Sequence, residues 1–311
     1  MQCFNRLLPA FGALLLAAIA LPSQGQDDQP RFLSLSPPEG LAIIPLMEGW
    51  VANADGSYTI SFGFINRNTD QDVDIPLGEN NYIEPAEFDG MQPTHFPSGR
   101  GTGVFTVTLP ADQADTDVWW RLRSGEGEVL QVPGRRGSAA YELDFIRPRP
   151  QGSFQPLAAF GDTGLSAGLT ANISDHGETV AAGEPVELVV NARDPAERDP
   201  EDPRFGEPLD MNVEFNKHQG PGEVTFERDP EAPVRENPFD EDDPRFAFFT
   251  APDSNEAVIQ GGEGSVMVRA TFSEPGEYII RAVVDVHTAP DSSYADQCCW
   301  SNVYTRVTVS E

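Results

Sequence analysis

Residues 266–285 carry the clearest hydrophobic pattern of the chain, two alternating runs joined by a turn. Every second residue is apolar at 266–272 and again at 278–284, which is the period of half-buried β-strands. Between the runs Pro275 restricts φ and Gly276 can adopt a positive φ, so the chain can reverse its direction there. The pattern predicts two strands that form either a hairpin or a corner between two sheets.

The same alternation predicts short strands along most of the chain. The turn at residues 53–56 (Asn-Ala-Asp-Gly) predicts a hairpin between the first two of them. In the run at 117–123, Trp120 belongs to the inward face and Trp119 to the more exposed one. The remaining predicted strands cover residues 41–51, 57–66, 73–77, 104–109, 128–132, 140–145, 185–192, 209–215, 245–250 and 302–309.

Interruptions of this pattern predict the domain organisation. Residues 80–103 have no period and many turn residues, so they are expected to form a long loop. The Arg-Pro repeats at 147–152 predict a stiff linker. We therefore predict an all-β protein with two Ig-like β-sandwich domains in tandem after a signal peptide. The expected boundaries are 27–146 for the first domain, 147–180 for a linker and lead-in, and 181–311 for the second domain.

The N-terminus has the features of a secretory signal peptide, expected to cover residues 1–26. Arg6 supplies the positive charge, residues 11–21 form an apolar run too short to span a bilayer, and small residues follow it. The mature chain is expected to be secreted or periplasmic and not to insert into a membrane.

The charge of the chain limits its partners. Asp and Glu total 50 against 20 Lys and Arg, a formal net charge of -30, and Lys217 is the sole lysine. Such a surface repels nucleic-acid backbones and anionic lipids, so neither is an expected partner. A protein or a glycan of unknown identity is the expected partner.

The second half of the chain also resembles a known family. Asp194-Pro195 after a strand, a strand ending at Phe215, the turn Pro275-Gly276-Glu277-Tyr278 and a last strand ending at Val309 are similar to a PKD-type Ig-like module over about residues 180–311. The resemblance implies a β-sandwich in which Tyr278 packs at a corner. It further implies a spacer, an adhesion unit or a ligand-binding unit.

Motifs for catalysis are weak. The segment 164–168 (Gly-Leu-Ser-Ala-Gly) matches a nucleophile elbow, but the neighbouring sequence predicts neither the buried parallel strand nor the helix that this motif requires. The four histidines are isolated, without metal-ligand spacing. We predict a non-catalytic binding or structural protein, with an accessory carbohydrate-binding protein or a hydrolase of unrecognised type as alternatives.

A ligand site is expected at one end of the first sandwich, in the predicted loop. Aromatic and hydrogen-bonding side chains gather there, a mixture suited to a sugar or a peptide. The alternative is a loop that covers an open sheet edge, with Phe88 and Phe96 as plugs. The expected site residues are Tyr82, Glu84, Gln92, His95, Arg100 and Trp119.

The acidic loops of the second half suggest a calcium site. Asp194 and Asp285 each follow a predicted strand at the same end of the sandwich, with Asp199 and Asp202 in the adjoining insert. Carboxylate oxygens are the ligands that Ca²⁺ prefers. The alternative is an acidic loop that binds only water.

Cys298 and Cys299 are adjacent and are the cysteines that remain once Cys3 leaves with the signal peptide. An oxidising compartment favours a disulfide, here between neighbours, which would form a rigid kink before the last strand. Reduced thiols that bind Cu(I) together with His287, or a bond between two molecules, are the alternatives.

Overall fold

The structure is a computed structural model of the 311-residue chain. It describes residues 40–311 apart from 70, 144–151, 163, 198, 200, 202–207 and 287–298. The described helical segments are 3-10 turns of three residues each, and the rest of the regular structure is strand. The prediction of an all-β protein is confirmed. The predicted signal peptide lies outside the described residues.

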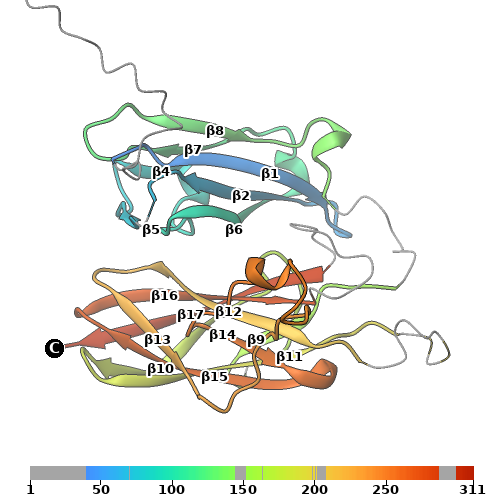
Figure 1. Cartoon of the computed structure of the whole chain (residues 1–311). Helices are drawn as coiled ribbons and strands as arrows, with labels where there is room; N and C mark the ends of the chain where they lie inside the picture. The colour runs from blue at the N-terminus through green and yellow to red at the C-terminus, as the bar shows by residue number, and fades with distance from the viewer. Residues whose placement is uncertain are drawn as a thin grey trace, which may run out of the picture. The chain divides into compact units, whose positions relative to one another are not determined.

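The N-terminal part is a sandwich built from two three-stranded sheets and one strand pair (Figure 1). One sheet has the order β1-β2-β6 and the other the order β4-β7-β8, while β3 pairs with β5. Their bounds are β1 (Ile44–Ala52), β2 (Tyr58–Asn66), β3 (Val73–Asp74), β4 (Asn81–Glu84), β5 (His95–Phe96), β6 (Gly99–Leu109), β7 (Val118–Leu122) and β8 (Leu130–Gly134).

Aromatic rings fill the core between these sheets. Phe62 of β2 stacks on Phe105 of β6 with ring centroids 5.0 Å apart, and Trp120 of β7 meets Phe105 edge-on at 5.0 Å. The predicted β1-β2 hairpin is present, because Gly56 N donates to Asn53 O across the turn. The alternation of apolar residues therefore predicts both the strands and the side chains that they bury.

The predicted loop at 80–103 is wrong in part, since it contains β4, β5 and the start of β6. In β4, Ile83 and Asn81 are both buried. Because Asn81 is polar, the sequence of β4 does not show the alternation of apolar and polar residues that predicts a strand. The Asn81 amide donates to the carbonyl oxygens of Ile75 and Pro93, at 2.9 and 2.8 Å. A polar side chain with its hydrogen bonds satisfied can replace an apolar one in a core.

Two predicted strands are also wrong. Residues 139–141 form the 3-10 turn η4 (Ala139–Tyr141), and residues 246–248 form η5 (Phe246–Phe248). Neither turn buries a residue, and among the described residues of the predicted strand at 140–145 the sheet pairing is an isolated bridge between Glu142 and Trp50 of β1. An apolar run predicts a strand only where a neighbouring strand can pair with it.

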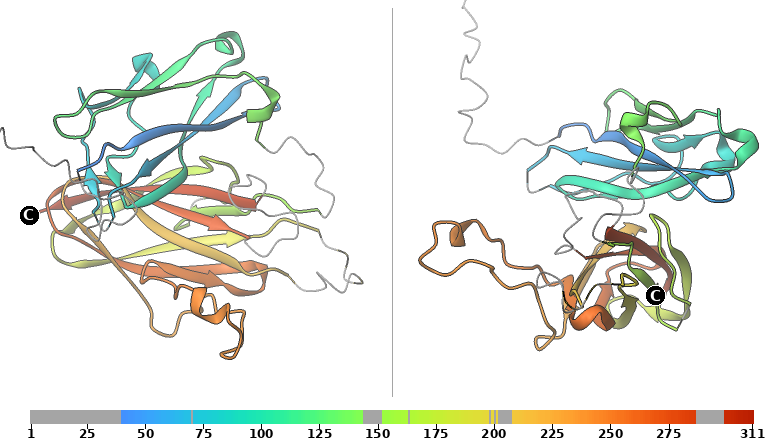
Figure 2. Two further views of the ribbon diagram at one scale, coloured as in Figure 1. Left: turned by 45° about the horizontal axis from the view of Figure 1, so that its top comes forward. Right: turned by 90° about the vertical axis from the view of Figure 1, so that its right-hand side faces the viewer.

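The C-terminal part is a sandwich of a five-stranded sheet and a four-stranded sheet, in the orders β10-β17-β16-β12-β14 and β13-β15-β11-β9 (Figure 2). With β10 parallel to β17, this strand arrangement is that of an Ig-like sandwich. The bounds are β9 (Leu157–Phe160), β10 (Asn172–Ala181), β11 (Pro185–Arg193), β12 (Met211–Gln219), β13 (Val224–Arg228), β14 (Glu256–Ile259), β15 (Glu263–Phe272), β16 (Gly276–Asp285) and β17 (Trp300–Ser310).

The turn at 273–275 joins the two C-terminal sheets. Because β15 and β16 belong to different sheets, the two alternating runs form a corner rather than a hairpin. Tyr278 is buried there, its ring 4.7 Å from that of Phe272, and its hydroxyl donates to Glu274 O at 2.8 Å. The corner position that the family resemblance implies for Tyr278 is therefore present.

We expect the variant Tyr278→Phe to lower the free energy of unfolding by about 0.5–1.5 kcal/mol, since it removes the hydroxyl that bonds Glu274 O. The measurement is urea denaturation. Tyr141→Phe is the control, because Tyr141 is 56% exposed and its substitution should change stability by less than about 0.5 kcal/mol. Equal stabilities of the two variants would contradict the role of the corner.

The outer face of the five-stranded sheet hydrogen-bonds to residues 90–104 within the compact unit 38–311. Asn302 donates to Gly103 O at 2.8 Å, Tyr304 donates to Val104 O at 2.9 Å, and Gln219 donates to Gly90 O at 2.9 Å. Residues that the period assigns to a solvent face are thus buried. The domain boundaries themselves remain a prediction.

Candidate functional site

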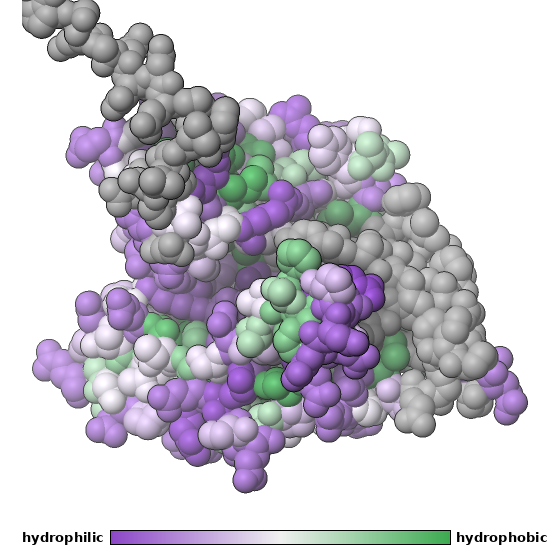
Figure 3. Space-filling model, in the orientation of Figure 1, coloured by the Kyte–Doolittle hydropathy of each residue, from purple (hydrophilic) through white to green (hydrophobic). Residues whose placement is uncertain are grey.

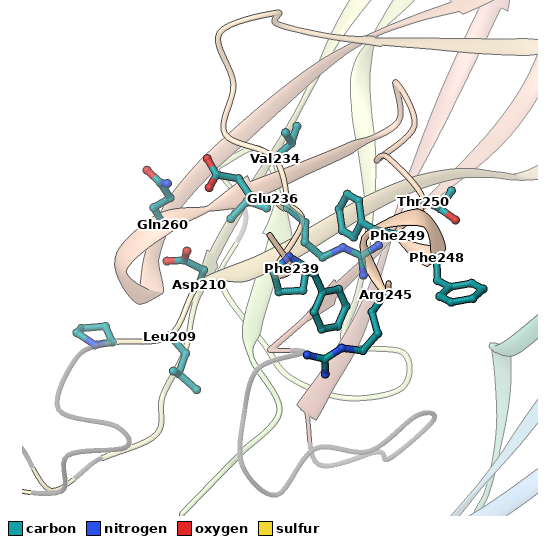
Figure 4. A pocket seen from close by; sticks show the side chains of 14 residues that line it. Leu209, Asp210, Val234, Glu236, Phe239, Arg245, Phe248, Phe249, Thr250 and Gln260 are labelled. Atoms are coloured by element: carbon teal, nitrogen blue, oxygen red, sulfur yellow. The ribbon is translucent and has the colours of Figure 1, made fainter. Parts of the chain in front are cut away.

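A large pocket lies beside the edge of the five-stranded sheet, where the segment between β13 and β14 folds over β12 and β14 (Figure 4). Its volume is about 1080 Å³. Apolar side chains of Leu209, Val234, Phe239, Phe249 and Val258 line it, together with Arg235 and Arg245. We call it the aromatic-arginine pocket.

The segment at 229–255 takes its shape from turn residues rather than from strand pairing. Asp229, Asn237 and Asp243 each accept a hydrogen bond from the backbone N two residues later, at 2.9, 3.1 and 2.8 Å. Such side-chain bonds close turns, and the prolines of the segment withhold donors from a sheet. Val258 N of the edge strand donates to Pro233 O at 2.8 Å, which holds the segment against β14.

Each arginine of the pocket lies over a phenylalanine ring. The Arg245 guanidinium is 4.2 Å from the centroid of Phe239, and the Arg235 guanidinium is 5.5 Å from that of Phe249. Asp243 holds Arg245 through two hydrogen bonds of 2.7 and 3.0 Å, which lower the pKa of the Asp243 carboxyl. The charge of Arg245 is therefore already neutralised by Asp243, and the Arg245 side chain forms part of the pocket wall.

Arg235 is the positively charged side chain of the pocket that can bind a ligand. Among the described residues the Arg235 guanidinium makes no hydrogen bond or ion pair, and it lies over the ring of Phe249. Burial raises the pKa of Glu256, and the charge of Arg235 opposes this rise from a distance. Asp210 and Glu236 also line the pocket, on the side away from Arg245 and Phe248 (Figure 4).

Aromatic side chains beside the pocket are open to solvent. Phe248 is 82% exposed and points away from the other pocket residues in Figure 4, and Phe246 is 38% exposed. Figure 3 shows hydrophobic residues over this segment on an otherwise largely hydrophilic face. Exposed aromatic residues on a polar surface are typical of recognition sites.

The sequence-predicted ligand residues do not form one site. Tyr82, Glu84 and Trp119 lie together on the outer face of β4 and β7, where Glu84 pairs with Trp119 across the strands. Arg121 donates to Glu84 at 2.6 Å and lies 5.8 Å from the Trp119 ring. Trp119 is half-buried, as the alternation predicts.

The other three predicted residues lie elsewhere. His95 bonds Asp74 at 2.9 Å, and Arg100 bonds Glu48 at 2.7 Å. Both line a second cavity of about 340 Å³. Gln92 is fully buried and donates to Asp89 at 2.6 Å, so it is a structural residue.

The predicted calcium residues are partly outside the described structure. Asp194 follows β11 and Asp285 ends β16, while Asp199 is exposed in the insert and Asp202 lies outside the described residues. Within the described part of the chain, no group of three or more His, Cys, Asp or Glu side chains could hold a metal ion. The calcium site remains a prediction.

Cys299 is buried at 1% exposure in the C-terminal core and is disulfide-bonded. Cys298 and His287 lie outside the described residues, so the bond between neighbouring cysteines remains a prediction. Trp300 is half-buried, and its ring lies against Gly103.

Sequence reasoning missed the aromatic-arginine pocket. The prediction assigned residues 245–250 to a strand. The signal was Phe246-Ala247-Phe248-Phe249, an aromatic run that breaks the strand period within a segment rich in Pro and Asp. Such a run fits a turn that displays aromatic rings better than a strand that buries one face.

Ser166, the serine of the motif at 164–168, is not part of a nucleophile elbow. Its hydroxyl donates to Ala171 O, and its backbone pairs with that of Ala158. The described residues around it form no helix, which that motif requires. None of the described helical segments is long and apolar enough to cross a membrane.

No known protein family and no curated protein matches this chain. Among solved structures, WR4, an MSP family member from C. elegans, is 7% identical with a TM-score of 0.23, over 45% of this chain and 92% of its own. The D00-D0 domain of intimin is 11% identical with a TM-score of 0.23, over 86% of this chain and 100% of its own. The collagen adhesin from S. aureus is 9% identical with a TM-score of 0.21, over 86% and 92%. At these TM-scores the likenesses carry no argument, and the PKD resemblance remains a prediction.

Proposed function

We propose that this protein is a secreted or periplasmic, non-catalytic binding protein, and that its aromatic-arginine pocket holds a segment of a partner protein. The ligand segment carries an aromatic or aliphatic side chain next to a single carboxylate. The observation that carries the proposal is Arg235, a guanidinium over the Phe249 ring with no hydrogen bond to the described residues, in the wall of a largely apolar pocket.

The chemistry of the pocket selects this ligand. Apolar walls bury a hydrophobic side chain, and a guanidinium without a partner can bind a carboxylate with two parallel hydrogen bonds. Asp210 and Glu236 line the same pocket and would repel a ligand with several negative charges. A strongly acidic segment is therefore a poorer ligand than one with a single carboxylate.

The position of the pocket on the sandwich supports a role in ligand recognition. The pocket lies on an irregular segment that is attached to a rigid sandwich, which is the usual arrangement for binding sites on β-sandwiches. The apolar run and positive charge of the N-terminus favour export, which would place the pocket in contact with extracellular or periplasmic partners.

Selection from a random-peptide display library tests the proposal. The purified protein should enrich peptides in which Phe, Tyr, Trp or Leu stands next to Asp or Glu. Replacing Arg235 by Gln should reduce the affinity for an enriched peptide about tenfold or more, because it removes a charged hydrogen-bond donor. Fluorescence anisotropy with the labelled peptide measures the change.

Arg306→Gln is the matched control, since Arg306 is an exposed arginine on β17 and pairs with Asp175 at 3.5 Å. It should bind the peptide as the unchanged protein does. The proposal is refuted if no such motif is enriched, or if Arg235→Gln and Arg306→Gln bind the peptide equally well.

A further inference from the structure

The second cavity lies over the outer face of the five-stranded sheet. Glu214 and Asn216 of β12 and Arg281 of β16 line it from the sheet, and Asp253 lines it from the segment before β14. His95 and Arg100, which the sequence singles out as ligand residues, line it from β5 and β6. Its volume of about 340 Å³ is at the lower end of the range for small-molecule sites. We call it the sheet-face cavity.

Two residues that line the cavity each have a buried donor without a hydrogen-bond partner among the described residues. The donors are Arg281 Nη1 and Asn216 Nδ2, on residues that are direct cross-strand neighbours. Buried donors are normally paired with protein atoms, water or a ligand, because an unpaired one is destabilising. Because Arg281 and Asn216 are cross-strand neighbours that both line the cavity, acceptor oxygens of water or of a bound molecule can satisfy this pair of donors.

The other basic side chains of the cavity, apart from His218, already have carboxylate partners. Arg100 bonds Glu48 at 2.7 Å, Lys217 bonds Asp74 at 3.1 Å, and His95 bonds the same Asp74. Lys217 is the sole lysine of the chain and its side chain is 4% exposed, so this pairing is internal to the fold. Glu48 and Asp74 do not pair with Arg281, so the Arg281 guanidinium is available to a ligand in the cavity.

Carboxylates line the cavity as well. Glu214 and Asp253 both belong to its wall, and neither is within ion-pair distance of Arg281 among the described residues. A ligand must therefore offer acceptor oxygens to Arg281 and Asn216 and donors to Glu214 and Asp253. A hydroxyl group both accepts and donates, whereas an oxyanion would satisfy the first pair and be repelled by the second.

From this arrangement we infer that the sheet-face cavity binds a neutral sugar residue. Its hydroxyl groups accept hydrogen bonds from Arg281 and Asn216 and donate to Glu214 and Asp253. Phe64, Pro93 and Pro97 supply apolar surface for the C–H faces of the ring. This site is separate from the aromatic-arginine pocket and takes a different class of ligand.

The test uses the purified protein with glucose, galactose, mannose and N-acetylglucosamine as probes, and with sodium acetate and sodium sulfate at matched ionic strength. At a concentration about tenfold above its Kd, a bound sugar should raise Tm by roughly 2–4 °C. Arg281→Met should reduce the affinity for that sugar at least about tenfold, measured by isothermal titration calorimetry. Arg306→Met, on the neighbouring strand β17, should leave it unchanged.

Asp253→Asn provides a second test if Arg281→Met does not fold, because Asp253 is exposed in a turn and its substitution removes an acceptor from the wall. A Tm shift with sulfate or acetate and none with sugars would mean an oxyanion site and would overturn the inference. No shift with any probe would mean a water-filled cavity. A sugar shift that survives both Arg281→Met and Asp253→Asn would place the sugar elsewhere. Peptide binding at Arg235 is measured separately, so the two sites can fail independently.

Discussion

Replacing Trp120 by alanine is expected to lower the free energy of unfolding by about 3–5 kcal/mol, the cost of truncating a large buried aromatic residue. Trp120 is 0% exposed and contacts the rings of Phe105 and Phe62, at 5.0 and 6.2 Å. Its indole also donates to Asn81 Oδ1 at 3.0 Å in the buried core. The variant would leave both a cavity and an acceptor without a donor.

Urea denaturation measures the change, and the neighbouring residue provides the control. Trp119 belongs to the same strand but to its half-buried outer face, so Trp119→Ala should cost about 1 kcal/mol or less. If the two variants were equally stable, the assignment of inward and outward faces in β7 would be wrong.

The second large effect is a loss of stability as the pH falls below neutrality, caused by His218. The pKa of His218 is lowered from 6.5 to about 3, chiefly by burial and in addition by the charge of Arg281, while its bond to Met91 O opposes the shift. The ring of Tyr304 packs against it at 5.2 Å. His218 is therefore neutral in the folded protein at any pH near neutrality.

The sign follows from the lowered pKa. Below pH 6.5 the unfolded chain binds a proton at His218 that the folded protein does not bind until the pH reaches about 3. The contribution of neutral His218 to the free energy of unfolding is fully present above pH 6.5. As the pH falls between these limits, it is lost at about 1.4 kcal/mol per pH unit.

Urea denaturation at several pH values measures this slope. His218→Gln keeps a donor for Met91 O but cannot titrate, so its stability should depend less on pH than that of the unchanged protein. His176→Gln, on β10, should retain the full slope. Since the carboxylates titrate equally in all three proteins, identical slopes for all three would disprove the role of His218.

The sheet-face cavity contains residues that could be predicted from the sequence and one that could not. His95 and Arg100 were identified because aromatic and polar residues cluster around them, and both line the sheet-face cavity. Arg281, which carries the argument for that cavity, looked like an ordinary outward residue of a strand. Its role depends on residues far away in sequence, which no local pattern can indicate.

The alternation of apolar and polar residues by itself determined the all-β class and the inward faces, including those of Trp120 and Tyr278. This is possible because the side-chain period of a strand is a local property of the backbone. Tertiary structure alone decided that the outer face of the five-stranded sheet is covered, so that His218 and Arg281 are withdrawn from bulk water. It also decided that a segment rich in Asp and Pro folds into an aromatic pocket. Both outcomes depend on contacts between distant segments, since burial and pKa are set by what packs against a side chain rather than by its neighbours in sequence.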